Sequence, residues 1–163
     1  MDSGAEIRGD YRYRLWRVWD ATAQRLVYCM LNPSIANATA DDQTVKVCIG
    51  RAKQMEFGGI EVVNLFAFIA QKPPDMKAAA DPVGPENDAY LAHAAQRAGM
   101  MIAAWGDDGD YRGRSWKVIP ALTKHCALHA IKLTKGGAPC HPLRLGYDLQ
   151  PFVWRSKLED AIG

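Results

Sequence analysis

The sequence predicts an α/β fold: a three-layer α/β/α sandwich around a four-stranded, mostly parallel central sheet, with a β-hairpin at the N-terminus. Two patterns predict this fold class. Segments of helical periodicity alternate with apolar runs, which is typical of parallel sheets covered by helices. The runs are nearly continuous, as expected for strands buried on both faces. Because 163 residues suit one hydrophobic core, we expect residues 1–163 to form a single domain.

The hairpin is predicted from two segments near the N-terminus. Residues 11–19 alternate bulky or aromatic side chains with arginines, and after a polar break the apolar run 26–31 follows. The second strand should end at Asn32-Pro33, because proline interrupts a strand. Further along the chain we expect helices at 41–56, 86–98 and 115–124 and strands at 60–68, 100–105 and 127–133.

Composition excludes several classes of protein. With 48% hydrophobic and 23% charged residues, the chain is typical of a globular protein rather than a disordered or fibrous one. No apolar run approaches the roughly 18 residues of a membrane span, and the N-terminus lacks a secretory signal, so we expect a cytoplasmic protein without a membrane partner. The Gly-x-Gly-x-x-Gly and Gly-Lys-Ser/Thr fingerprints are absent, so no nucleotide cofactor is expected.

The four cysteines form no Cys-x-x-Cys pair, and we expect reduced thiols. Histidines and cysteines are crowded between residues 125 and 141, but without the ligand spacing of zinc fingers or ribbons. We therefore expect no metal.

The charge is distributed unevenly. The net charge is only +2, yet residues 112–147 contain seven basic and no acidic side chains, whereas residues 75–110 contain seven acidic and two basic ones. One anion-facing side would produce this pattern, because phosphate groups are bound mainly by Lys and Arg. An ordinary solvated face is the alternative.

Polar residues at the predicted carboxyl ends of strands are the candidate site, because ligands of open α/β sheets bind there. Asn64 interrupts an apolar strand and needs a partner, which is either neighbouring backbone or the edge of a ligand such as a nucleobase. Asn32 cannot act as a base but can orient a water through its carbonyl oxygen. His141, between Pro139 and Pro142, can stabilise an oxyanion.

Four short motifs resemble the uracil-DNA glycosylase superfamily, in the same order over about residues 26–146. They are Leu31-Asn32-Pro33-Ser34, Val62-Val63-Asn64-Leu65, Ala104-Trp105-Gly106 and His141-Pro142-Leu143-Arg144-Leu145. The first is similar to the asparagine-type opening of the mismatch-specific branch. The chain also resembles a bacterial and phage family of unknown function that shares the Leu-Asn-Pro-Ser opening and the Gly-x-Pro-x-His-Pro-Leu close.

The glycosylase resemblance implies base flipping and hydrolysis of an N-glycosidic bond in DNA, as in base excision repair, by a monomer without a cofactor. Asn32 would position the water, Asn64 would read the base, and His141 would stabilise the leaving group. The substrate pocket would also include Pro33, Ser34 and a stacking phenylalanine, Phe57 or Phe66. DNA would be held by Lys135, Arg112 and Arg114, with Leu145 and Arg144 filling the vacated stack.

Departures from the glycosylase pattern leave other functions open. The aspartate that activates water in the best-known members is missing, Arg144 replaces a proline, and the loop that begins at Asp107 is acidic. The cysteine spacing differs from that of the iron–sulfur branch. A nucleoside or nucleotide hydrolase on the same fold, or a non-catalytic nucleic-acid-binding module, are the alternatives.

Overall fold

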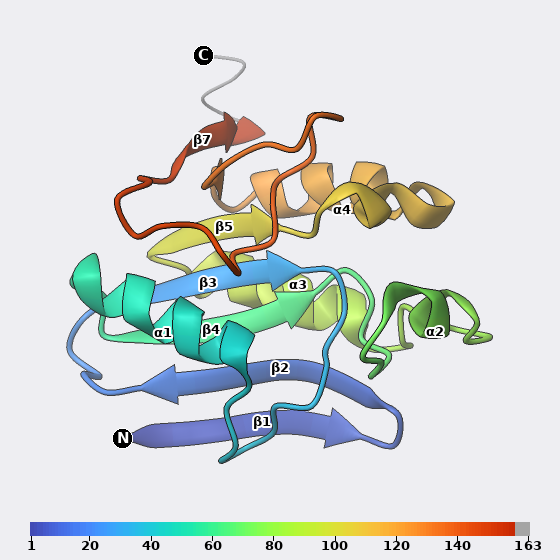
Figure 1. Cartoon of the computed structure of the whole chain (residues 1–163), viewed down its shortest axis with the longest axis horizontal. Coiled ribbons are helices and arrows are strands. Elements are labelled where there is room, and N and C mark those ends of the chain that lie inside the picture. Colours follow the sequence, from blue (N-terminus) through green and yellow to red (C-terminus); the bar gives the residue numbers. More distant parts are fainter. Residues whose placement is uncertain (159–163) are drawn as a thin grey trace.

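The computed structural model describes residues 1–158 and shows a seven-stranded mixed sheet in the order β1-β2-β4-β3-β5-β6-β7 (Figure 1). The strands are β1 (Asp2–Arg8), β2 (Tyr11–Val18), β3 (Arg25–Met30), β4 (Gly59–Asn64), β5 (Met100–Ala104), β6 (Leu128–Ala130) and β7 (Phe152–Arg155). The helices are α1 (Gln43–Gln54), α2 (Pro73–Lys77), α3 (Asn87–Arg97) and α4 (Arg114–Thr123), with a 3-10 segment η1 (Asp107–Gly113) before α4.

The α/β class is confirmed, but the predicted four-stranded sheet is wrong. Strands β4, β3, β5 and β6 are parallel to one another, as predicted, and three antiparallel strands extend this core at its two edges. The predicted hairpin between 11–19 and 26–31 does not form. Strand β2 pairs with β1 and with β4, so β4 separates β2 from β3, and the N-terminal hairpin consists of β1 and β2.

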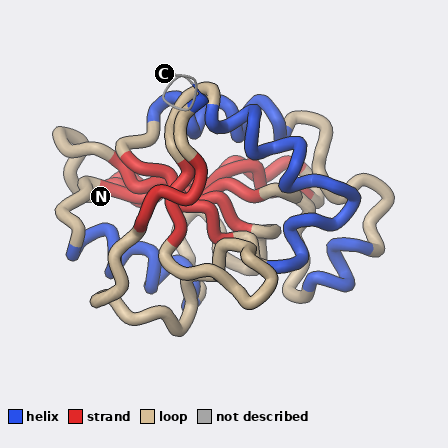
Figure 2. Tube along the Cα trace, turned by 90° about the horizontal axis from the view of Figure 1, so that it is seen from above, coloured by secondary structure: helices blue, strands red, loops and turns tan. Residues whose placement is uncertain are grey.

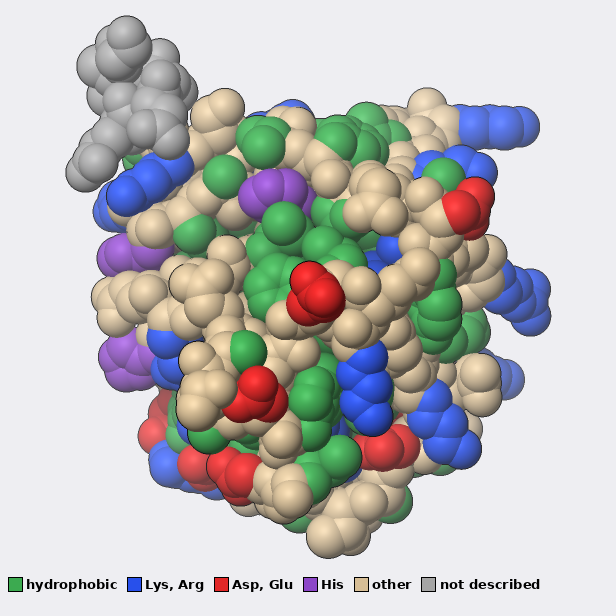
Figure 3. Space-filling view, turned by 90° about the vertical axis from the view of Figure 1, so that its left-hand side faces the viewer, with side chains coloured by type: hydrophobic (Ala, Val, Ile, Leu, Met, Phe, Trp, Pro, Cys, Tyr) green, Lys and Arg blue, Asp and Glu red, His purple; other side chains and the backbone are tan. Residues whose placement is uncertain are grey.

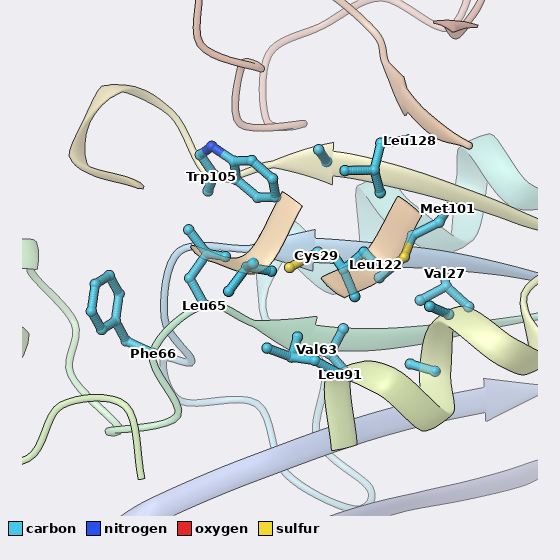
Figure 4. Close-up of a cluster of buried hydrophobic side chains, with 14 of the residues drawn as sticks. Val27, Cys29, Val63, Leu65, Phe66, Leu91, Met101, Trp105, Leu122 and Leu128 are labelled. Carbon is cyan, nitrogen blue, oxygen red and sulfur yellow. The ribbon is translucent and has the colours of Figure 1, made fainter. Parts of the chain in front are cut away.

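Helices cover both faces of the sheet (Figure 2). Alternate side chains of β3 point to opposite faces, as the two-residue period of a strand requires. Val27 and Cys29 join the core cluster that packs against α3 and α4, as Figure 4 shows for Leu91 and Leu122 of those helices. Leu26, Tyr28 and Met30 join a second cluster, which includes Val45, Cys48 and Ala52 of α1.

The three predicted helices form: α1 and α3 are slightly shorter than predicted, and α4 begins and ends one residue earlier. Helix α1 begins where the Asp42 carboxylate accepts a hydrogen bond from the backbone N–H of Val45, 2.9 Å away. Such an N-cap satisfies a donor that the first turn otherwise leaves unpaired. In the part of the chain that the structure describes, no helix has the length and apolarity to cross a membrane.

The parallel core creates a topological switch point. The chain passes from β3 to β4 on one side and then returns to place β5 on the other side of β3. Loops that leave the carboxyl ends of β3 and β5 therefore diverge toward opposite faces, which opens a crevice between them. The sequence predicts Asn32, Asn64 and His141 at this end of the sheet.

Glu61 forms the main buried charge cluster of the sheet. Its side chain is 0% exposed and accepts hydrogen bonds from Arg97, the shortest at 2.6 Å, while Arg14 lies 3.0 Å and Arg25 3.6 Å away. These arginines come from α3, β2 and β3, so one carboxylate joins three elements.

We expect Glu61→Gln to lower the free energy of unfolding by about 3 kcal/mol, because it leaves three arginines around a neutral amide. Urea denaturation followed by circular dichroism measures the change. The charge-matched control is Glu56→Gln, an exposed residue, which should change stability by less than about 0.5 kcal/mol. Equal stability of the two variants would contradict this role of Glu61.

Candidate functional site

A cavity opens beside the carboxyl ends of the parallel neighbours β3 and β4. The outer part has a volume of about 560 Å3 and lies between the loop after β3 and residues 70–73. A smaller inner part of about 60 Å3 adjoins it and is lined by Arg12, Met30, Asn32, Ser34, Asp42, Thr44, Val45, Asn64 and His141. Asn32, Ser34, Asp42 and His141 line both parts. We call the two parts together the base cavity.

Asn32 is oriented by its own amide nitrogen. Nδ2 donates to the carbonyl oxygens of Ala70 at 2.8 Å and Pro33 at 3.1 Å. Because these acceptors fix the nitrogen, Oδ1 is the amide atom that remains to accept a hydrogen bond. The side chain is half-buried at the cavity, so this acceptor suits a bound water.

Asn64 ends β4 and is 1% exposed. The backbone there is held by Asn87, whose Nδ2 donates to the carbonyl oxygens of Asn64 at 2.8 Å and Leu65 at 3.1 Å. The side-chain Nδ2 of Asn64 is buried and has no hydrogen-bond partner among the described residues. A buried amide without a partner costs about 1–3 kcal/mol, so this group suits a ligand that accepts its hydrogen bond.

Arg12 of β2 forms the other side of the inner cavity and is 4% exposed. Its Nη1 donates to the carbonyl of Ala36 at 2.9 Å, whereas its Nε is buried and has no partner among residues 1–158. Burial lowers the pKa of Arg12 to about 10, against the opposing effect of the Asp42 carboxylate, so the guanidinium stays charged at neutral pH. The inner cavity thus presents two unused donors, one of them cationic.

His141 lies at the mouth of the base cavity. Its Nδ1 accepts a hydrogen bond from the backbone N–H of Leu143 at 3.1 Å, so the neutral ring carries its proton on Nε2. Partial burial of the ring lowers the pKa of His141, while the charge of Asp42 acts in the opposite direction. The neutral ring is therefore a hydrogen-bond donor at neutral pH.

Two residues of the cavity, Arg12 and Asp42, were not among the sequence candidates. Arg12 belongs to an alternating strand pattern with Arg14 and Arg17, which gives no local sign of a buried cation. Asp42 is recognisable only as a residue near a helix start. Its Oδ1 caps α1, yet the carboxylate also lines both parts of the base cavity.

Of the predicted substrate residues, Ser34 lines the base cavity, but Pro33 and the phenylalanines do not. Pro33 is buried, and its carbonyl accepts from Asn32 and from the N–H of Ala70. Phe57 precedes β4 at the opposite end of the sheet, where its carbonyl accepts from Trp19. Phe66 is fully buried, with its ring 6.0 Å from that of Tyr111 (Figure 4).

The predicted DNA-binding residues differ in their exposure and contacts. Lys135 and Arg144 are exposed, and the Arg112 guanidinium lies over the ring of Tyr111 at 5.1 Å. Arg114 is buried and donates to the Leu65 carbonyl at 2.8 Å and to Asp88 at 2.7 Å. Leu145 is half-buried against the α1 side of the core. Leu143, two residues before it, lines the outer part of the base cavity.

The opposite end of the molecule is chemically different. Figure 3 shows the face at the amino ends of the parallel strands, where acidic and basic side chains are interspersed. Among the described residues, no three His, Cys, Asp or Glu side chains are grouped to hold a metal ion.

The fold and the cavity define an α/β protein with a pocket at the carboxyl ends of two parallel strands, β3 and β4. The family described as Protein of unknown function (DUF1643) matches residues 12–143, and the chain belongs to this family. The match includes Arg12, Asn32, Asp42, Asn64 and His141. No curated protein and no solved structure matches the chain.

We expect His141 to titrate below 6.5, the ordinary value for histidine, and to carry its proton on Nε2 when neutral. The charged groups that face it in the cavity are Asp42 and Arg12. Asp42→Asn should lower the pKa of His141 further, because the variant removes a negative charge that favours the imidazolium form. Nitrogen-detected NMR titration measures both. A neutral Nδ1–H form, or an increased pKa in Asp42→Asn, would contradict this geometry.

Proposed function

We propose that this protein hydrolyses the N-glycosidic bond of a base in DNA. The observation that carries the proposal is the convergence of Asn32, Asn64 and His141 on one small polar cavity. These residues are 32 and 77 positions apart along the chain: Asn32 follows β3, Asn64 ends β4, and His141 lies in the loop after β6. Their placement supports the roles that the glycosylase resemblance implies.

The cavity suits a polar ring edge next to a hydrolytic centre. The buried donors of Asn64 and Arg12 lie at the inner end, where the edge of a flipped base would accept their hydrogen bonds. Asn32 Oδ1 and the Asp42 carboxylate lie where the inner and outer parts meet, since both residues line both parts. A water held there can donate hydrogen bonds to both groups, and the Asp42 carboxylate can accept its proton as a general base.

The proposed reaction is a single displacement at C1′ of the sugar. The water oxygen bonds to C1′ while the C1′–N bond breaks, and the electron pair of that bond leaves with the base. Asp42 accepts the proton of the water, and Asn32 orients it. The Nε2–H of His141 and the Arg12 guanidinium stabilise the negative charge on the departing base, which later takes a proton from solvent.

A serine-hydrolase mechanism fits the cavity less well, although Ser34 and Asp42 accompany His141 there. In that mechanism the histidine must accept a proton from the serine hydroxyl. Here Nδ1 of His141 is occupied by the Leu143 N–H, and Nε2 carries the remaining proton. Ser34 also has no hydrogen bond to His141 in the structure, so the serine is not activated.

The test uses oligonucleotides that each carry one uracil, hypoxanthine, xanthine, 5-hydroxymethyluracil or mismatched thymine, in single and double strands. Base release is measured by alkaline cleavage of the abasic product. We expect release of at least one of these bases by the purified protein. No release from any strand would overturn the proposal. Hydrolysis of free nucleosides alone would favour a nucleoside hydrolase, and binding alone would favour a non-catalytic module.

Asp42→Asn should reduce the rate of base release about 10²- to 10⁴-fold, the usual contribution of a general base. Asparagine caps helices as well as aspartate does, so the variant should fold. His141→Ala should reduce the rate about 10- to 1000-fold, the range around the loss of one oxyanion donor. The matched control is Asp75→Asn, an exposed first-turn residue of α2 near the outer cavity. Wild-type rates in Asp42→Asn would exclude Asp42 as the base.

A further inference from the structure

A second cavity, of about 530 Å3, is lined by residues other than those of the base cavity. Its aromatic walls are Trp105 after β5, Trp116 in α4 and Trp154 in β7. The remaining wall is the loop Gly136 to Pro139, which leads directly into His141. We call this space the tryptophan cavity. Pro139 is held at the end of β5, because its carbonyl accepts from the N–H of Gly106 at 2.7 Å.

The polar groups of the tryptophan cavity are largely unused. Trp105 is 4% exposed, and no residue in the described part of the chain accepts a hydrogen bond from its Nε1. Asp107 accepts one hydrogen bond, from Thr134 at 2.6 Å. Asp110 also lines the cavity, and its carboxylate accepts none from residues 1–158. The site therefore offers one indole donor and several carboxylate acceptors.

Close packing fixes the Trp105 ring. A Cβ on Gly109 would lie only 2.1 Å from the indole Cδ1, so the backbone of η1 touches this ring and only glycine fits there. Trp154 meets the same ring edge-on, with 5.8 Å between centroids. Trp116, in contrast, is 68% exposed. Because Trp116 lines the cavity and is exposed, its ring is accessible for stacking by an aromatic ligand.

The cavity and its surroundings carry charges of both signs. Asp107, Asp110 and Arg155 line the cavity, and the Arg155 guanidinium lies 4.0 Å from the centroid of the Trp154 ring. The exposed Lys117 and Lys135 follow or precede lining residues in the sequence, and such cations suit phosphate groups. Carboxylates in an aromatic pocket accept hydrogen bonds from the N–H groups of a base.

We infer that the tryptophan cavity binds one unstacked nucleobase that presents an amino group, as guanine, adenine or cytosine does. The base stacks on Trp116, its amino group donates to Asp110 or Asp107, and a ring acceptor takes the Trp105 N–H. This inference rests on the proposed function, because a nucleic acid whose modified base occupies the base cavity would place a neighbouring base here. The acidic start of η1 then serves base recognition rather than phosphate binding.

The first experiment uses mononucleotides and the indole N–H signals of the intact protein. Guanosine 5′-monophosphate should shift the NMR signals of Trp105, Trp116 and Trp154 and leave those of Trp16 and Trp19, which line no part of the cavity, unchanged. Purine riboside 5′-monophosphate, which has neither an amino group nor an N–H on its ring, should bind at least tenfold more weakly. Equal affinities, or shifts spread over all five tryptophans, would overturn the inference.

The second experiment uses variants and short single-stranded oligonucleotides. Trp116→Ala should weaken oligonucleotide binding about 5- to 150-fold, the range for loss of one base stack. Asp110→Asn should remove the preference for amino-bearing bases, with Asp75→Asn as the charge-matched control. If Trp116→Ala weakened the binding of oligonucleotides but not the binding of guanosine 5′-monophosphate, the proposed site would be overturned, because both ligands present the same base to Trp116.

The two proposals fail separately. If Trp116→Ala weakens binding but the wild-type protein releases no base from any strand, the tryptophan cavity stands and the glycosylase proposal falls. If base release is normal and Trp116→Ala binds oligonucleotides as the wild type does, the glycosylase proposal stands and the tryptophan cavity falls.

Discussion

The segments around the base cavity depend on buried guanidinium groups that donate hydrogen bonds to backbone carbonyls. In residues 1–158 the buried arginines are Arg12, Arg17, Arg51 and Arg114. The two from β2 hold the loop after β3, through the carbonyls of Ala36, Asn37 and Ala40. Arg51 holds residues 145–149 against α1, and Arg114 holds the end of β4. The bonds to Ala36 and Leu65 are buried, where backbone carbonyls need a partner.

This use of arginine changes what the basic composition means. The net charge of +2 includes four guanidinium groups that are at most 7% exposed, so the positive charge of the surface is smaller than the count of residues suggests. Arg114 belongs to the basic segment 112–147, yet its charge is directed at Asp88 and a carbonyl. A run of basic residues in a sequence therefore does not by itself define a face for phosphate.

The parallel core and its helices were predictable because their signals are local. Buried strands such as β3 and β5 are continuous apolar runs, and α1 has helical periodicity with a capping aspartate. The partner of β2 was not predictable, since the register that joins Leu15 to Val62 connects residues far apart in the sequence. Strand β1 was missed because only Gly4 in it is buried, which leaves no alternating apolar pattern to recognise.

The site was predictable where topology decides the outcome. Asn32 follows β3 and Asn64 ends its parallel neighbour β4, so the pairing of these strands brings the two asparagines together. His141 lies farther along the loop after β6, which passes the end of β5, where the Pro139 carbonyl accepts from the N–H of Gly106. Arg12 and Asp42 reach the same cavity by routes that the local sequence does not indicate, one from an antiparallel strand beyond β4 and the other from a helix cap. The Asp42 carboxylate caps the N-terminus of α1 and also lines the cavity. The packing of α1 on the sheet therefore also positions the proposed general base. The loop before His141 connects the two cavities in a similar way. It forms a wall of the tryptophan cavity and leads to the histidine of the base cavity.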